Sequence, residues 1–167
     1  FGPGPGRFYV PGTFRPTAEV VERAMVAGGM GGIYISHMRD ETAGVLDSVR
    51  ETIEIGERGG LPTQVTHHKI IGKANWGRSA DTLKLIDEAR ARGVDATLDE
   101  YPYTASATSI QAALMPAYAL EGGRAEVLKR LKNPSMRSEL RKATARILAE
   151  ERGGGDPNNV QLARCDW

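Results

Sequence analysis

This sequence has a single cysteine, almost no net charge and no long apolar run. Cys165 is the only cysteine, so no disulfide can form within the chain, which favours a reducing compartment. No apolar run approaches the roughly 20 residues that a membrane-spanning helix needs. No positively charged and then apolar leader opens the sequence either. These absences together predict a soluble, cytoplasmic protein that does not bind membranes.

Charged residues are common but balanced. The formal net charge is only +1 at pH 7, so no overall field attracts nucleic acid or an anionic membrane. Basic residues outnumber acids between positions 124 and 146, but they fall on amphipathic helical patterns. Such a run indicates a solvated helical face rather than an RNA-binding surface. Hydrophobic residues make up 40% and charged residues 26%, which is the composition of a globular protein.

Both ends of the sequence read as parts of something longer. The 167 residues suffice for one ordinary domain with its own core. The chain begins with a Gly- and Pro-rich segment over residues 1–16 and has no initiator Met. It stops shortly after Val160 to Ala163, which read as the start of an apolar strand. We therefore expect the chain to be a piece of a longer protein.

A helix followed by a strand recurs along the first hundred residues. Helical patterns and strand patterns alternate, with helices predicted at 17–28, 42–59 and 79–93 and strands at 32–36, 62–66 and 94–98. Thr17 and Ser79 are the predicted N-caps of the first and third helices. The period is about 30 residues, which is the length of one βα unit. Alternating strands and amphipathic helices predict a parallel sheet in an α/β fold.

The pattern changes after Tyr103. A loop of small residues leads into a segment in which two charged helices are predicted, at 124–132 and at 134–150. We therefore divide the chain into a β/α part, residues 1–120, and a helical segment with the start of a further strand, residues 121–167.

Each predicted strand stops at polar residues that are capable of chemistry. The first strand ends at His37, the second at His67 and the third at Asp99. In parallel β/α folds the functional sites form at the carboxyl ends of the strands, where the loops converge. Two neighbouring strands that both end in histidine would bring two imidazoles within reach of one ion.

His37 and His67 are therefore the candidate metal ligands. Neutral imidazole is a usual ligand of Zn²⁺, and a catalytic zinc site keeps one position open for water. The bound ion lowers the pKa of that water and polarises a carbonyl. Two histidines leave the coordination short, so further ligands must come from elsewhere. The alternative is that each histidine is an ordinary strand-end residue that hydrogen-bonds to a neighbour.

Three further residues are candidate substrate ligands, each with a simpler alternative. Lys69 could meet an anionic substrate group as a point charge, or be a solvated lysine. Arg39 could bind a carboxylate with both arms of its guanidinium, or pair with Asp40, Glu41 or Asp99. Tyr101 could line a pocket, or pack at the end of its strand. His68 follows His67 directly, so its side chain is expected to face the other way and to pack.

Several motifs together resemble one family. The motifs lie in order along nearly the whole chain, and they are Phe8-Tyr9-Val10-Pro11-Gly12-Thr13-Phe14, Ile35-Ser36-His37-Met38-Arg39-Asp40-Glu41, Val65-Thr66-His67-His68-Lys69, Asn75-Trp76-Gly77 and Asp99-Glu100-Tyr101-Pro102-Tyr103-Thr104-Ala105-Ser106. They resemble the D-aminoacylase, or N-acyl-D-amino-acid deacylase, branch of the metal-dependent amidohydrolases.

The resemblance implies a fold, a metal and a reaction. The fold is a (β/α)₈ TIM-type barrel, of which this chain would supply the strand-4 loop through strand 7 and an inserted helical segment. His37 and His67 match the zinc histidines of the family, Lys69 matches a lysine that holds the substrate carboxylate, and Tyr101 falls in a segment that lines the substrate pocket. The implied reaction is hydrolysis of the amide bond of an N-acyl-D-amino acid by a zinc-activated water.

Parts of the family pattern have no counterpart in this chain. They are an early His-x-His pair, a bridging cysteine ligand and a late aspartate that serves as ligand and general base. The general base is therefore expected outside this chain, and the chain alone should not be a competent enzyme. Two alternatives stay open at this point, a related amidohydrolase that cleaves cyclic amides such as dihydropyrimidines or hydantoins, and a non-catalytic βα domain that binds a partner through its basic helices.

Overall fold

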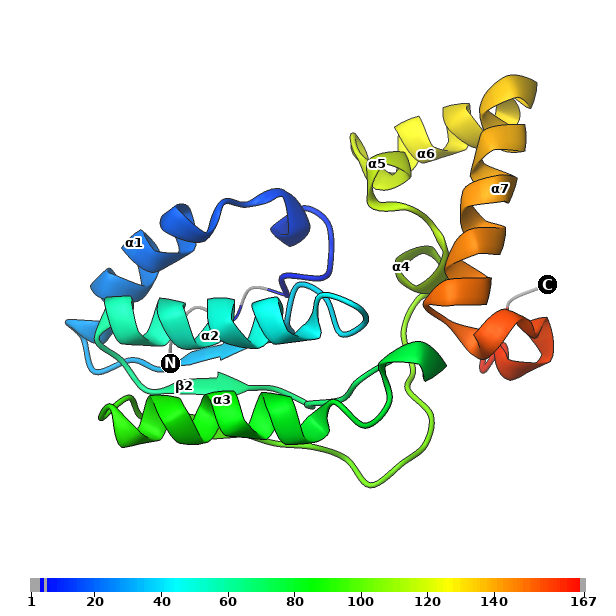
Figure 1. The fold of residues 1–167 in the computed structure, drawn as a ribbon. Coiled ribbons are helices and arrows are strands. Elements are labelled where there is room, and N and C mark those ends of the chain that lie inside the picture. The colour runs from blue at the N-terminus through cyan, green and yellow to red at the C-terminus, as the bar shows by residue number, and fades with distance from the viewer. Residues whose placement is uncertain (1–3, 5, 166–167) are drawn as a thin grey trace. The chain divides into compact units, whose positions relative to one another are not determined.

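The computed structural model describes residue 4 and residues 6–165. The chain divides into two compact units (Figure 1). The first unit contains Phe1–Ile70 and Asn75–Ser106, and the second contains Ile71–Ala74 and Ala107–Trp167. The division falls after Ser106, before the helix that begins at Ile110, and the boundary near residue 120 that the sequence predicts stays a prediction. The assignment of the two parts to a barrel and to an inserted segment stays a prediction.

The first unit is a three-stranded parallel sheet with its connecting helices. Its elements in chain order are the 3₁₀ helix η1 (Gly12–Phe14), α1 (Thr17–Gly28), β1 (Tyr34–Ser36), α2 (Val45–Gly59), β2 (Thr63–Val65), α3 (Ser79–Ala91) and β3 (Ala96–Leu98). The short 3₁₀ helix η2 (Lys73–Asn75) has its first two residues in the second unit. The strands lie in the order β1-β2-β3, and Ser36 is in register with Val65, which is in register with Leu98. The predicted α/β class and the parallel sheet are therefore confirmed. The three strands end at the same level, so the residues that follow them lie at one edge of the sheet.

The helices begin slightly differently from the prediction. Thr17 and Ser79 are the first residues of α1 and α3 rather than their N-caps, which are Pro16 and Arg78. The second helix begins at Val45 and not near Thr42, because the Asp40 carboxylate ties the intervening residues into a turn. Its oxygens accept the Thr42 backbone N–H at 2.6 Å and the Gly44 backbone N–H at 3.1 Å. This turn fixes the loop between His37 and α2.

Apolar side chains of the helices and strands form two clusters in the first unit. The larger cluster joins α2, α3 and the strands through Met38, Val45, Val49, Ile53, Val65, Ile86, Ala89 and Ala96. The other joins α1 to α2 and β1 through Val20, Val21, Ala24, Tyr34, Ile55 and Leu61. Met38 is fully buried directly after the first site histidine. The core therefore anchors the loop that carries the candidate site.

The crossing of α1 and α2 requires a glycine at position 28. A Cβ atom there would lie 2.4 Å from the backbone oxygen of Gly59, which cannot move away without shifting α2. At Gly29 a Cβ would meet its nearest atoms at 3.6 Å, which is ordinary contact. We expect Gly28→Ala to lower the free energy of unfolding by about 1–3 kcal/mol, as overpacking does. We expect Gly29→Ala to stay within about 0.5 kcal/mol of the parent in the same urea titration, and equal effects would contradict the close approach of the two helices.

The second unit is helical. It contains α4 (Ile110–Leu114), α5 (Ala117–Leu120), α6 (Gly123–Lys132), α7 (Pro134–Glu150) and the 3₁₀ helices η3 (Gly153–Gly155) and η4 (Pro157–Asn159). The prediction for α7 is confirmed: Pro134 occupies the first turn, and the Asn133 side chain accepts the Met136 backbone N–H at 3.2 Å. The prediction of a strand from Val160 to Ala163 is wrong for this structure, because the described residues place no strand beside this segment to complete its hydrogen bonds. In the described part of the chain no helix is both long and apolar enough to cross a membrane.

Candidate metal centre

His37 and His67 come together at the carboxyl ends of β1 and β2. Nδ1 of His37 lies 2.9 Å from Nε2 of His67, and the ring centroids are 4.4 Å apart. Their meeting follows from the register, because the two histidines come one and two residues after the paired Ser36 and Val65. The two side chains border an open pocket of about 530 Å³ that is also lined by Gly4, Gly6, Ile33, Ile35 and Thr66. The structure thus brings the two predicted residues together, and their role as metal ligands stays a prediction.

The N-terminal loop holds His37 in place. The backbone N–H of Arg7 donates to the His37 carbonyl at 3.0 Å. The ring of Phe8 stacks on the imidazole at 5.1 Å between centroids, and the ring of Tyr9 meets it edge-on at the same distance. The imidazole is thus packed between two aromatic rings and the second histidine.

His67 has an unusual backbone conformation. Its φ is 42°, the only positive value at a non-glycine residue in the described chain. Such a conformation costs on the order of 1–3 kcal/mol and persists where the surroundings impose it. Here the Asp99 carboxylate accepts the His67 backbone N–H, and the Asp99 carbonyl accepts the His68 backbone N–H at 2.7 Å. Asp99 therefore turns the chain so that His67 points toward His37.

His68 faces away from the pair, as its alternating position predicts. Its Nε2 lies 2.9 Å from the hydroxyl of Thr82 on α3, and the residue is buried. Burial lowers the pKa of His68, and the charge of Lys69 acts in the same direction against the opposing charge of Glu100. The neutral ring packs between β2 and α3 and takes no part in the pair.

Glu41 is a member of the site that the sequence reasoning did not single out as a ligand. Its carboxylate Oε1 lies 3.4 Å from Nδ1 of His67 and 3.6 Å from Nε2 of His37. The side chain is 1% exposed. His37, Glu41 and His67 form a group whose potential ligand atoms all lie within 4.8 Å of one another. The available signal was the spacing of four residues from His37, but Asp40 beside it carries the same charge, and only the turn at Asp40 decides which acid faces inward.

Lys69 completes the cluster. Its Nζ lies 2.6 Å from Oε1 of Glu41, 2.8 Å from Nδ1 of His67 and 2.8 Å from the His67 carbonyl oxygen. The ammonium is also 5.5 Å from the centroid of the Tyr101 ring, which itself lies 6.3 Å from the His67 ring. The structure therefore brings Lys69 and Tyr101 beside the histidines, and the alternative of a solvated lysine does not hold.

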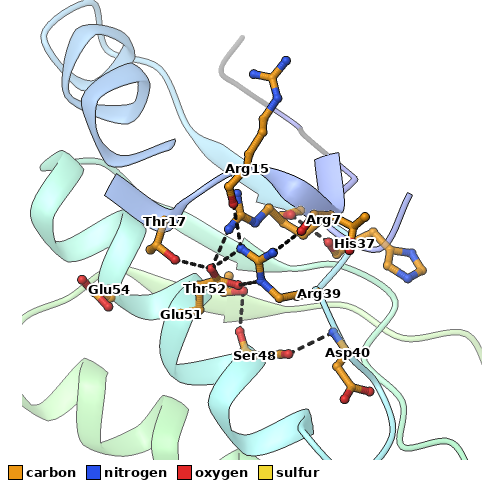
Figure 2. A network of polar contacts seen from close by, with 12 residues as sticks. Arg7, Arg15, Thr17, His37, Arg39, Asp40, Ser48, Glu51, Thr52 and Glu54 are labelled. Carbon is orange, nitrogen blue, oxygen red and sulfur yellow. Dashed lines mark hydrogen bonds and ion pairs between the residues drawn. The ribbon is translucent and has the colours of Figure 1, made fainter. Parts of the chain in front are cut away.

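Arg39 pairs with a residue of α2, and its predicted contact with substrate stays a prediction. Its guanidinium forms a bidentate ion pair with Glu51 of α2, at 3.0 Å from Nε to Oε2 and 2.8 Å from Nη2 to Oε1 (Figure 2). Nη1 donates to the carbonyl of Thr13, and Nη2 donates to the carbonyl of Arg15 as well as to Glu51. The guanidinium is thus committed to a structural network. Its acidic partner is Glu51 and none of the three acids considered from the sequence.

Glu51 is the centre of this network. Besides Arg39 it accepts from Arg7 at 2.6 Å and from the hydroxyl of Thr17 at 2.5 Å (Figure 2). The Arg7 side chain is only 1% exposed. These bonds attach the loop over residues 7–15 and the start of α1 to α2. Because the same loop packs on His37, the network also supports the candidate site.

The donor set of the pair fits a divalent metal ion. Two neutral imidazoles can each offer a ring nitrogen to one point, and imidazole suits zinc, copper, iron and nickel. Metal-binding histidines usually turn their outer ring nitrogen toward a carboxylate or a carbonyl. Glu41 stands at that place for both rings. His37 and His67 could therefore hold such an ion, with Glu41 behind them.

Comparisons with known proteins point to one group of enzymes. Over 106 residues, 64% of this chain, the sequence is 42% identical to a D-aminoacylase of Alcaligenes xylosoxydans xylosoxydans. Over 103 residues it is 46% identical to an N-acyl-D-glutamate deacylase of the same organism. The chain spans only 22% and 21% of the lengths of these curated relatives. No protein-family model matches it.

The fold agrees with solved structures from the same group. A crystal structure of N-acyl-D-glutamate deacylase from Bordetella bronchiseptica, in complex with zinc and a phosphonate inhibitor, matches 88% of this chain with a TM-score of 0.62 and 30% identity. A crystal structure of D-aminoacylase matches 89% with the same TM-score and 31% identity. Each match covers 36% of the solved chain. The chain is therefore a homologue of one part of the D-aminoacylase-type amidohydrolases.

Proposed function

We propose that this chain is part of a longer, metal-dependent hydrolase that cleaves the amide bond of N-acyl-D-amino acids. The observation that carries the proposal is the pair of opposed ring nitrogens of His37 and His67, 2.9 Å apart, with the Lys69 ammonium beside them. The relatives support it through their names, D-aminoacylase and N-acyl-D-glutamate deacylase. One solved neighbour was crystallised with zinc and a mimic of a tetrahedral intermediate.

His37 and His67 would hold the metal, and we propose zinc. A divalent ion in such a site lowers the pKa of water and polarises an amide carbonyl. The protein contributes the fixed positions of the two rings, through the aromatic contacts on His37 and the Asp99 bond to the His67 backbone. Further ligands and the general base would come from parts of the protein outside this chain.

Lys69 and Tyr101 would bind the carboxylate end of the substrate. The ammonium is held by Glu41 and the His67 carbonyl, and the Tyr101 ring lies next to it. A fixed cation beside the histidines that would hold the metal is suited to the carboxylate of an N-acyl amino acid, whose amide nitrogen is attached to the carbon next to that carboxylate. The preferred enantiomer would be the one that places its carboxylate at Lys69 and its amide carbonyl at the metal site at the same time.

We further propose that the three strands belong to a (β/α)₈ barrel. The supporting observations are the parallel order β1-β2-β3 and the uneven burial of the sheet. In β1, Tyr34 and Ser36 are buried, whereas Ile35 between them is 36% exposed. A barrel interior supplied by the remaining strands would cover such side chains.

The test is a substrate panel on the full-length protein that carries this chain. We expect hydrolysis of N-acetyl-D-amino acids at rates at least tenfold above those of the L-enantiomers, loss of activity after chelation, and recovery with zinc. Cleavage of hydantoins or dihydropyrimidines in place of the linear amides would overturn the substrate assignment but keep a hydrolase. Metal-free protein that hydrolyses neither class and binds a partner in a salt-dependent manner would overturn the hydrolase assignment.

A further inference from the structure

Glu41 is a buried acidic residue, and its carboxylate needs a charged partner. Its side chain is 1% exposed, and a buried carboxylate is stable only when it is paired. The ion pair with Lys69, at 2.6 Å, supplies that partner. Its backbone is held on both sides, by the buried Met38 before it and by the Asp40 turn around Thr42 after it. The loop is built to keep this carboxylate inside.

The same carboxylate faces the outer nitrogens of both histidines. Oε1 lies 3.6 Å from Nε2 of His37 and 3.4 Å from Nδ1 of His67, just beyond hydrogen-bond length for the first and near its limit for the second. The inner nitrogens, Nδ1 of His37 and Nε2 of His67, face each other. A negative charge behind the rings favours the tautomers with their protons on the outer nitrogens. Those tautomers leave both lone pairs at the shared inner point.

The contact that Lys69 makes with His67 corresponds to a different tautomer of the His67 ring. An ammonium can only donate, so the 2.8 Å contact from Nζ of Lys69 makes Nδ1 of His67 an acceptor. Nε2 then carries the ring proton and donates to Nδ1 of His37. In this arrangement the Lys69 ammonium contacts Glu41, the His67 carbonyl and the His67 ring.

We propose that Glu41 is the positioning residue of this site, which couples metal binding by the two histidines to the availability of Lys69 for substrate. The proposal rests on the proposed function of His37, His67 and Lys69. When His67 offers Nε2 to a metal, its ring proton sits on Nδ1 and turns to Glu41. The Lys69 contact to Nδ1 would then be lost, and the ammonium proton that makes it could turn to a substrate carboxylate. Glu41 keeps Lys69 in place throughout the exchange.

The test compares Glu41→Gln with the parent in the full-length protein. Gln keeps the shape of the side chain and removes the charge that favours the metal-binding tautomers. We expect the zinc Kd, measured by competition with a chelating dye, to rise about 10–100-fold, the range typical of residues behind metal ligands. At saturating zinc we expect KM for an N-acetyl-D-amino acid to rise at least fivefold, with a smaller change in kcat. Glu41→Asp, which restores the charge, should recover part of the zinc affinity.

Two controls separate this role from a role in folding. Glu54→Gln, on the exposed side of α2 and paired only with Arg58 among the described ion pairs, should leave the zinc Kd and KM within twofold. If Glu41→Gln fails to fold because Lys69 is left without its partner, the double variant Glu41→Gln with Lys69→Met removes both charges. That double variant should melt near the parent temperature and still bind zinc at least tenfold more weakly.

The outcomes distinguish this inference from the proposed function. Zinc binding by the parent together with a zinc Kd and a KM within twofold in Glu41→Gln would overturn the role of Glu41 and leave the hydrolase proposal standing. A parent protein that binds no zinc would overturn both. A weakened zinc Kd in the double variant, with unchanged thermal stability, would support the effect of Glu41 on metal binding, and the rise of KM in Glu41→Gln at saturating zinc would support the coupling to Lys69.

Discussion

Replacing His37 and His67 together by alanine is expected to abolish metal-dependent amide hydrolysis in the full-length protein. The two imidazoles are the metal ligands that this chain supplies in the proposed site, and their ring nitrogens already meet at 2.9 Å. A metal ion stabilises the charge of the transition state by several kcal/mol. Its loss should therefore lower kcat/KM by about 10³-fold or more. Elemental analysis of the purified variant should find less than a tenth of the zinc of the parent.

His68 provides a matched control within the same loop. It is the neighbour of His67, but it packs against Thr82 of α3 and not against the other imidazole. His68→Gln should lower the melting temperature, because the buried ring is lost, while the zinc content stays as in the parent. Equal zinc loss in His68→Gln and in the double alanine variant would show that the loop, and not the pair of imidazoles, determines metal content.

Replacing Glu51 by glutamine is expected to have the largest effect on stability. The change leaves the buried guanidinium of Arg7 without an ion-pair partner in the described chain, and it removes the bidentate partner of Arg39. Breaking a buried ion pair from one side costs about 3–5 kcal/mol, because the other charge stays buried. Since the network holds the loop that packs on His37, zinc binding should weaken as well. Urea denaturation and zinc titration of the full-length protein measure the two effects.

Glu54 is the control for this experiment on the same helix. It points away from the network (Figure 2) and pairs with Arg58 one turn further along, where both side chains are about half exposed. Exposed pairs of this kind contribute about 0–1 kcal/mol. Glu54→Gln should therefore change the free energy of unfolding by less than 1 kcal/mol. Similar losses in the two variants would mean that the Arg7–Glu51 pair carries no special weight.

The sequence is sufficient for features that depend on local periodicity. The alternation of helices and strands locates β1, β2 and β3 to within two residues, and the parallel register then brings His37 and His67 together. α7 is predicted with its true bounds from its amphipathic pattern, and the structure adds the Asn133 cap at its start. These features require only neighbours in sequence and one rule of βα topology.

The features that the sequence does not determine depend on contacts between distant residues. Arg39 has three acids within reach on its own loop or strand ends, and it binds Glu51, twelve positions away on α2. Glu41 and Asp40 are adjacent acids, and only the turn tied by Asp40 directs Glu41 inward. The positive φ of His67 also has no signal in its residue type, because it comes from the bond to Asp99, the residue that follows β3.

The most direct test of the account is a crystal structure of the zinc-loaded full-length protein, with anomalous data collected at the zinc edge. The account predicts an anomalous peak at about 2.0–2.1 Å from Nδ1 of His37 and from Nε2 of His67. It also predicts Oε1 of Glu41 within hydrogen-bond distance of an outer ring nitrogen. A zinc ion bound elsewhere, with the two rings still bonded only to each other, would contradict it.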